Sequence, residues 1–173
     1  PMYAHHAHNE HQHTPEIIKQ LKEGKSFALI TDAGTPGISD PGFLLLRNCI
    51  ENEIETEVLP GATAFVPALI QSALPNHDFY FCGFLTKKKG RQTRLNQLRE
   101  LKSTLIFYES PHKIEKTLGD FVEHFGRERQ ACLSREISKK FEEHLRGTLG
   151  ELLGIVKNTK LKGEMVLSVE GVK

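Results

Sequence analysis

A segment rich in glycine, proline and small polar residues most constrains how this chain can fold. Thr31–Gly42 reads TDAGTPGISDPG and directly follows the short apolar run Phe27–Ile30, which is typical of a buried strand. Its glycines and prolines cannot all continue a strand or begin a regular helix, so the backbone must turn sharply. Loops of this kind at the carboxyl end of a parallel strand bind small ligands in α/β proteins. A long turn ahead of a capped helix explains the same residues equally well.

A second small-residue turn favours the ligand-binding interpretation. A strand is expected at 55–59, and it runs into Pro60–Ala64, which opens a helix extending to about Ser72. Earlier, Thr14 and Pro15 have the character of an N-cap and a first helical residue, and strand 26–31 and a helix from Phe43 follow. This alternation predicts a βαβ arrangement with a parallel sheet. Both glycine loops would then lie at one end of that sheet and form a ligand crevice.

The pattern changes at Leu74–Asn76, which predicts two α/β domains, 1–75 and 76–173. In the second domain, strands are expected at 79–83, 104–108, 130–134, 142–146 and 165–169. Helices are expected at 91–101, 113–125 and 149–157.

Composition narrows the class of protein. The net charge of +1 predicts no general affinity for nucleic acid, so any such contact must come from a local patch. Cys49, Cys82 and Cys132 are far apart and flanked by apolar residues, which fits reduced thiols in a cytoplasmic protein. No apolar run is long enough to span a bilayer. The histidine-rich start lacks the cysteine and apolar content that would fix a coordination geometry, so no metal site is expected.

One dense basic stretch is the candidate patch for nucleic acid. Lys87, Lys88, Lys89 and Arg91 follow a predicted strand, and Arg94 lies just beyond. Phosphate contacts from such a loop would position RNA without reading its sequence. A solvated loop and helix face is the alternative explanation.

Seven segments along the chain match the motifs of one known family, in that family's order and over nearly the whole chain. They are His8–Glu10, Thr31–Gly42, Leu59–Ala64, Phe81–Leu85, Thr104–Lys113, Arg135–Glu143 and Lys162–Leu167. Together they resemble the ribosomal RNA ribose methyltransferases of the tetrapyrrole methylase superfamily, which act on a cytidine 2′-oxygen of bacterial small-subunit rRNA. Because several distinct motifs match in register, the signal is far stronger than a lone glycine pattern. Family members normally begin with a further βα segment, and many carry a helical tail, so we expect this chain to be the middle and larger part of a member.

The resemblance implies two small α/β domains of the tetrapyrrole methylase type, with the ligand cleft between them. It implies S-adenosylmethionine as cofactor and ribosomal RNA or the small-subunit particle as substrate. We also expect a homodimer in the cytoplasm. The cofactor-binding residues that it implies are Asp32, Ala33, Gly34, Thr35, Gly61, Thr63, Ala64, Tyr108 and Glu164.

A ribose hydroxyl is a poor nucleophile, so a general base or a strong orienting group would help the reaction. Polar residues follow two predicted strands, and the resemblance favours both loops as the substrate face. The catalytic candidates are Glu109, Arg135, Glu136 and Lys139, with His112 beside the first. A surface salt-bridge cluster is the alternative for the last three.

Two other functions remain open at this stage. A methylase of a tetrapyrrole or corrin would need a large apolar cleft, whereas RNA would need a basic face whose binding depends on salt. A truncated, non-catalytic chain that binds RNA or a partner is the alternative of another class.

Overall fold

The computed structural model describes residues 2–86 and 90–173, which form two compact units. Unit 1 is Pro1–Thr63 and unit 2 is Ala64–Lys173. Helix α3 (Phe65–Ser72), which we expected to close the first domain, belongs to unit 2. The compact units therefore divide earlier in the chain than the boundary expected near residue 75.

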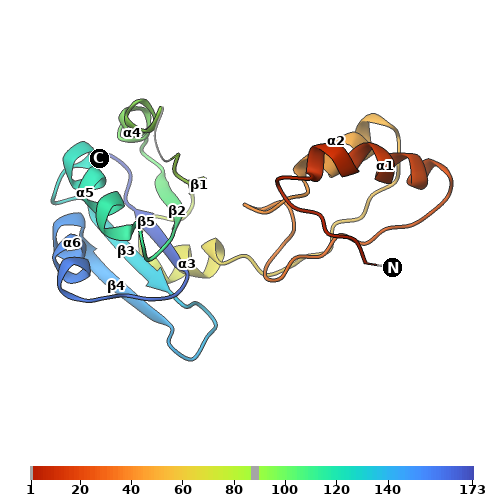
Figure 1. Cartoon of the computed structure of the whole chain (residues 1–173). Helices are drawn as coiled ribbons and strands as arrows, with labels where there is room; N and C mark the ends of the chain where they lie inside the picture. Colours follow the sequence, from red (N-terminus) through yellow and green to blue (C-terminus); the bar gives the residue numbers. More distant parts are fainter. Residues whose placement is uncertain (1, 87–89) are drawn as a thin grey trace. The chain divides into compact units, whose positions relative to one another are not determined.

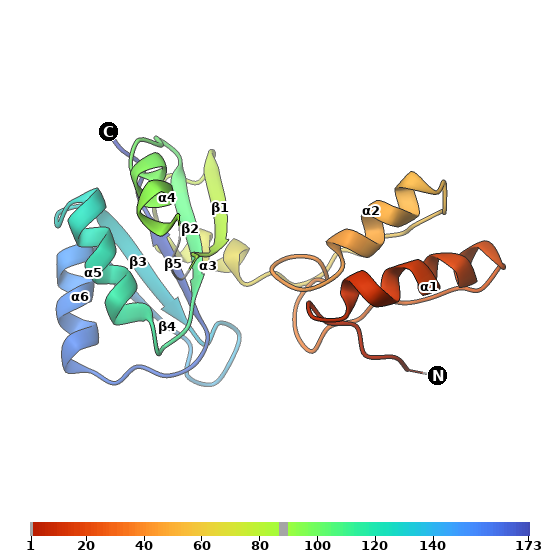
Figure 2. The ribbon, with the colours of Figure 1, turned by 45° about the horizontal axis from the view of Figure 1, so that its top comes forward.

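Among the described residues, unit 1 contains two helices that pack side by side, α1 (Glu10–Lys22) and α2 (Phe43–Glu51) (Figures 1 and 2). The Glu10 carboxylate accepts hydrogen bonds from the backbone N–H groups of Gly42 (3.0 Å) and Leu44 (3.2 Å). The first N–H groups of a helix have no partner within the helix, and they favour a negative charge. The first residue of α1 thus caps α2 and fixes how the glycine-rich loop enters that helix.

The helix start predicted at Thr14 and Pro15 is wrong. Helix α1 begins after Asn9, and Pro15 lies inside it. The Asn9 side chain accepts a hydrogen bond from the backbone N–H of His6 at 2.8 Å. This bond folds the histidine-rich segment into a turn that leads directly into the helix. A proline inside a helix removes one backbone hydrogen bond. Helix α1 nevertheless begins before Pro15, directly after the turn that ends at Asn9.

The two strands predicted in the first domain, and with them its parallel sheet, are also wrong. Residues 26–31 and 55–59 have no regular secondary structure, and neither run joins a ladder among the described residues. A strand exists only through pairing, since each of its N–H and C=O groups needs a partner. Ile30, Val58 and Leu59 are correspondingly exposed, so their apolar character does not come from burial within unit 1.

Unit 2 is built on one mixed sheet with the strand order β1-β2-β5-β3-β4. The first two strands are parallel and the other pairings are antiparallel. This confirms the mixed α/β architecture expected for the second half of the chain. The strands are β1 (Phe79–Phe84), β2 (Thr104–Glu109), β3 (Gln130–Arg135), β4 (Glu143–Thr148) and β5 (Met165–Val169).

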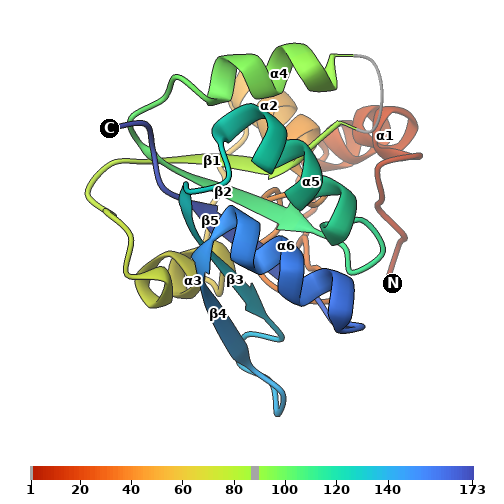
Figure 3. The same ribbon diagram turned by 90° about the vertical axis from the view of Figure 1, so that its left-hand side faces the viewer.

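Helices cover both faces of this sheet (Figure 3). One face packs against α4 (Arg91–Leu98), α5 (Ile114–Phe125) and α6 (Leu149–Asn158) in the main core. On the opposite face, α3 packs against the central strands in a smaller cluster. Alternate residues of a strand point to opposite faces, so Phe107 enters the main core and Ile106 meets α3. The Thr148 and Glu151 side chains form a capping box that starts α6.

Burial disfavours the reactive thiolate form of the cysteines. Cys49, Cys82 and Cys132 are free thiols, and burial raises the pKa of Cys82 to about 12. Burial also raises the pKa of Cys132, so neither thiol is activated as a nucleophile.

In the described parts of the chain, no helix has both the length and the apolar character needed to cross a membrane.

Candidate active site

The two glycine loops of unit 1 lie in contact, as their sequence suggests. The Thr35 hydroxyl donates a hydrogen bond to the Ala62 carbonyl at 3.0 Å. Gly61 lies close to the first loop, because a Cβ atom there would lie 2.8 Å from Thr35 Oγ1. A side chain at this position would force Thr35 to shift. The loops meet without the parallel sheet that we expected to hold them.

The first loop presents a carboxylate to solvent. Within the loop, the Thr31 hydroxyl donates to the carbonyls of Ala33 (3.0 Å) and Gly34 (3.1 Å), which tightens the turn around Asp32. The Asp32 side chain is exposed and forms no hydrogen bond or ion pair with any described residue. An exposed carboxylate in a glycine-rich loop, where no bulky side chain covers the backbone, is suited to bind ligand hydroxyl or ammonium groups.

The remaining predicted cofactor residues divide between the units. Thr63 ends unit 1, and Ala64 is the N-cap residue of α3 in unit 2. The Tyr108 ring, near the end of β2, packs edge-on against Phe81 and Phe84 at centroid distances of 5.2 and 5.6 Å. Glu164 directly precedes β5. The structure thus brings Asp32–Thr35, Gly61 and Thr63 together in one unit and places Ala64, Tyr108 and Glu164 in the other.

In unit 2, polar residues gather where the strands β1, β2 and β3 end, which we term the carboxyl end of the sheet. These three strands run in one direction, and Met165 at the start of β5 pairs with both Glu109 and Arg135. The loops after Phe84, Glu109 and Arg135 therefore all leave the sheet at this end. Ligands of α/β proteins bind outside the carboxyl ends of strands, so this end is the candidate substrate face.

Three charged side chains form a bonded cluster at the carboxyl end of the sheet. Lys139 Nζ lies 3.1 Å from Glu136 Oε1 and 2.8 Å from Glu164 Oε2. Glu136 Oε1 also accepts a hydrogen bond from the Glu164 backbone N–H at 3.0 Å. That bond and the one from Lys139 lower the pKa of Glu136. The bonds to Glu164 and Glu136 raise the pKa of Lys139. The cluster therefore holds both side chains in their charged forms.

Backbone geometry fixes this cluster. Glu136 has φ = 51° and Gly163 has φ = 92°, so both residues occupy the left-handed region. A Cβ atom at Gly163 would overlap the Glu136 carboxyl group. Non-glycine residues in this region store strain and concentrate at functional sites. Arg135 beside them is paired with Glu143, with 2.6 Å between Nε and Oε2.

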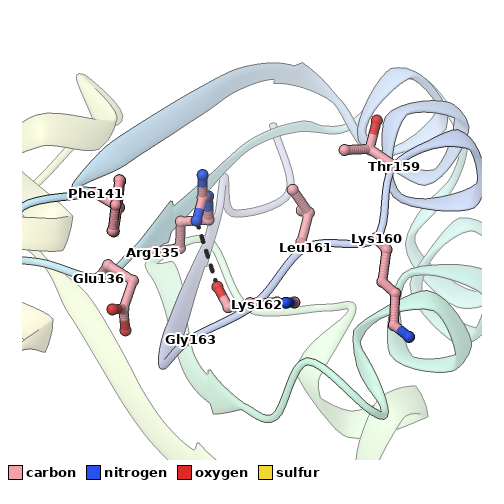
Figure 4. A pocket seen from close by; sticks show the side chains of 8 residues that line it. All are labelled: Arg135, Glu136, Phe141, Thr159, Lys160, Leu161, Lys162 and Gly163. Atoms are coloured by element: carbon pink, nitrogen blue, oxygen red, sulfur yellow. Dashed lines mark hydrogen bonds between the residues drawn. The ribbon is translucent and has the colours of Figure 1, made fainter.

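An open pocket of about 300 Å³ adjoins the cluster. Figure 4 shows its lining: Arg135, Glu136 and Phe141 on one side, and the loop 159–163 that leads into β5 on the other. The Arg135 guanidinium donates a hydrogen bond to the Lys162 carbonyl at 3.5 Å, which links the two sides. Phe141 and this loop are not among the predicted site residues, although Phe141, Lys162 and Gly163 lie within segments that match the family.

Glu109 serves the interior of unit 2. It is buried, and its carboxylate accepts hydrogen bonds from the Thr117 hydroxyl (2.6 Å) and the Ser110 backbone N–H (2.8 Å). Both of its oxygens are therefore occupied, unlike those of an available general base. The neighbouring His112 side chain is exposed.

The predicted basic patch is only partly within the described residues, since Lys87, Lys88 and Lys89 lie outside them. Arg91 is buried and paired with Asp120, with 2.8 Å between Nε and Oδ2. Arg94 donates to the Tyr80 hydroxyl at 2.9 Å and lies 5.2 Å from the centre of that ring. Arg91 and Arg94, the two arginines of this stretch, are thus both engaged with protein groups.

The loop that carries Phe141 contains a pH-sensitive carboxylate. Glu142 accepts hydrogen bonds from His144 (2.9 Å) and from the Ser138 backbone N–H (2.6 Å), and these bonds lower the pKa of Glu142. A carboxyl whose folded-state pKa is depressed contributes stability above its ordinary pKa, which is 4.5 for Glu142. That contribution disappears as the pH falls through the folded-state value.

We therefore expect Glu142→Gln to flatten the pH dependence of thermal stability. The melting temperature of the parent chain should fall more between about pH 5.5 and 3 than that of the variant. Glu115→Gln on α5, an exposed carboxylate without a hydrogen-bond partner among the described residues, should keep the parent profile. Parallel profiles for all three chains would contradict the assignment.

These features define a class of protein: an α/β chain with a ligand-type glycine loop in one unit and a charged carboxyl end of a mixed sheet in the other. Among solved structures, the methyltransferase CobJ is similar, with a TM-score of 0.66 at 18% identity over 92% of this chain and 70% of that one. A uroporphyrin-III C-methyltransferase from Thermus thermophilus, solved with S-adenosyl homocysteine, has a TM-score of 0.56 at 15% identity, covering 88% of this chain and 70% of that one.

The chain belongs to the tetrapyrrole (corrin/porphyrin) methylases, since the sequence profile of that family matches residues 3–153. A similar curated relative, from Halalkalibacterium halodurans, is named ribosomal RNA small subunit methyltransferase I. It is 43% identical over 171 residues, which cover 98% of this chain and 59% of the relative. The chain thus spans about 60% of the length of the relatives it matches.

Proposed function

We propose that the protein transfers a methyl group from S-adenosylmethionine to the 2′-oxygen of a cytidine in small-subunit ribosomal RNA. The similarity to relatives named for that RNA supports the substrate class. The observation that carries the proposal is the contact between the two glycine loops beside the exposed Asp32.

The residues of unit 1 fit the proposed cofactor. The Asp32 carboxylate can accept hydrogen bonds from ribose hydroxyls or from the methionine ammonium. Gly34, Thr35 and Gly61 are small and let the cofactor approach the backbone closely. When bound, S-adenosylmethionine supplies an electrophilic methyl group, so the protein must mainly align the reactants and exclude water. Thr63, Ala64, Tyr108 and Glu164 complete the proposed set of cofactor residues.

The charge states at the carboxyl end of the sheet indicate an orienting role. Glu136 has a lowered pKa, which makes it a weak proton acceptor, and Lys139 has a raised pKa, which keeps it protonated. General bases are most effective with a pKa near the working pH. We therefore assign Glu136 to accepting a hydrogen bond from the ribose, and Arg135 and Lys139 to contacting its phosphates. Of the basic stretch, Lys87, Lys88, Lys89 and Arg94 remain proposed RNA contacts.

Titration of the chain with S-adenosylmethionine by calorimetry tests the cofactor site. We expect saturable one-to-one binding, and a loss of about tenfold in affinity for Asp32→Ala, as for one charged hydrogen bond. Asp40→Ala, an exposed aspartate of the same loop, is the matched control and should bind like the parent chain. Equal affinity of both variants would remove Asp32 from the site. No binding by the parent chain would favour a non-catalytic binding chain.

Methyl transfer to isolated small subunits, read as resistance of one cytidine linkage to alkaline hydrolysis, tests the substrate. Binding of RNA should weaken steeply with salt. Binding of a porphyrin or corrin without RNA methylation would replace the RNA proposal with the corrin or porphyrin one. We further propose a cytoplasmic homodimer, which sedimentation of the chain tests.

A further inference from the structure

The pocket at the carboxyl end of the sheet combines an exposed aromatic ring with uncompensated positive charge. The Phe141 side chain is 64% exposed, and Lys140 Nζ lies 5.6 Å from the centre of its ring. Lys160 and Lys162 lie on the opposite wall of the pocket and are exposed. We term Lys140, Phe141, Lys160 and Lys162 the Phe141 surface.

The neighbouring charges do not neutralise the Phe141 surface. Lys139 is paired with Glu136 and Glu164, and Arg135 with Glu143. In contrast, Lys140, Lys160 and Lys162 form no ion pair with any described carboxylate. Three unpaired cations beside an exposed ring outnumber the single negative charge that Lys139 leaves over when it is shared by Glu136 and Glu164. This balance favours an anionic ligand that carries a flat group.

The turn that presents Phe141 is rigidly built. The Ser138 backbone N–H donates to Glu142 Oε2 at 2.6 Å, and the Glu142 backbone N–H donates to the Lys139 carbonyl at 3.1 Å. His144 holds the other Glu142 oxygen at 2.9 Å. The backbone that carries Phe141 is therefore held in place before any ligand arrives, which lowers the entropy lost on binding.

We propose that the Phe141 surface binds a single-stranded segment of RNA, with one base stacked on Phe141 and phosphates bound by Lys140, Lys160 and Lys162. Stacking on aromatic rings within a positively charged groove is how proteins bind single-stranded nucleic acid without reading its sequence. The inference rests on the proposed function and gives it an RNA-binding surface separate from the basic stretch before α4. The pocket lies beside Glu136, so the bound segment would flank the nucleotide that receives the methyl group.

Fluorescence anisotropy with a labelled, unstructured oligouridine tests this inference across a range of salt concentrations. Phe141→Ala should weaken binding about tenfold, and Phe141→Tyr should restore it, because the ring is retained. The double variant Lys160→Ala/Lys162→Ala should reduce the slope of log affinity against log salt by about 1.4, or roughly 0.7 for each phosphate that is no longer neutralised. The matched control Lys102→Ala/Lys116→Ala removes two exposed lysines from elsewhere in unit 2 and should keep the parent slope.

The outcomes separate this inference from the proposed function. If the parent chain binds the oligonucleotide and both Phe141→Ala and the lysine variant match the control, the Phe141 surface does not bind RNA, and the proposed function still stands. If the parent chain binds neither oligouridine nor small subunits at low salt, the RNA substrate is overturned together with this inference. Circular dichroism of each variant establishes that it is folded.

Discussion

Replacing Phe121 with alanine is expected to lower the free energy of unfolding of unit 2 by about 3–5 kcal/mol, the range for buried Phe→Ala substitutions. Phe121 is fully buried in α5. Its ring lies 4.7 Å, centroid to centroid, from both Phe107 of β2 and Phe125 one turn further along the helix. Removing the ring would leave a cavity at the centre of the main core, between helix and sheet, where neighbouring side chains can only partly collapse.

Urea unfolding of the whole chain measures this loss. The chain contains no tryptophan and three tyrosines, of which Tyr80 and Tyr108 lie in unit 2, so tyrosine fluorescence mainly follows this unit. Phe84→Ala is the matched control, since this ring at the end of β1 is 57% exposed. It should cost less than about 1 kcal/mol. Similar losses for the two variants would show that α5 does not form the main core as described.

Unit 2 was largely predictable from the sequence because its elements are also its core. Strand β5 was expected at 165–169 and is observed as Met165–Val169, a short apolar run buried on both faces. The apolar residues of α5 recur at helical spacing, and its buried face follows that spacing. Local pattern and tertiary burial agree in these elements, so either one predicts the other.

Unit 1 was not predictable in the same way. The runs 26–31 and 55–59 have the composition of buried strands, but strand formation depends on a pairing partner, which composition does not reveal. A hydrogen bond to the Asn9 side chain closes the turn before α1, and α2 is capped by Glu10, a residue far from α2 in sequence. Contacts of this kind leave no periodic signal.

The sequence indicated parts of the candidate site but not their geometry. The sequence predicted that the two glycine loops meet, but the parallel sheet expected to bring them together is absent from the described residues, and the contact is made through Thr35 and the Ala62 carbonyl. The charged cluster at the carboxyl end of the sheet depends on the left-handed conformation of Glu136, which no residue preference predicts at a glutamate. The residues around Phe141 in the sequence do not mark it as a ligand-binding side chain. Its position beside the loop 159–163 makes it a candidate for binding a ligand.

Replacing Arg91 with alanine should also cost about 3–5 kcal/mol, because it removes the cation from a buried network. The guanidinium donates to Asp120 Oδ2 (2.8 Å), the Thr117 hydroxyl (3.0 Å) and the Thr86 carbonyl (3.2 Å). Thr117 in turn donates to the buried Glu109. Without Arg91, two largely buried carboxylates would remain with no positive charge between them. Urea unfolding of the whole chain measures the loss.

Two further variants distinguish this structural role from RNA binding. Arg91→Lys keeps the charge but should recover only part of the stability, because an ammonium group cannot reproduce the fixed fork of donors that reaches three partners. Arg99→Ala, an exposed arginine just beyond α4, should change stability by less than about 0.5 kcal/mol. If Arg91→Ala instead unfolded like the parent chain but bound RNA more weakly, the side chain would bind RNA, as first expected from the sequence. If Arg91→Ala loses stability and Arg99→Ala does not, Arg91 belongs to the interior of unit 2, where it anchors the start of α4 against α5.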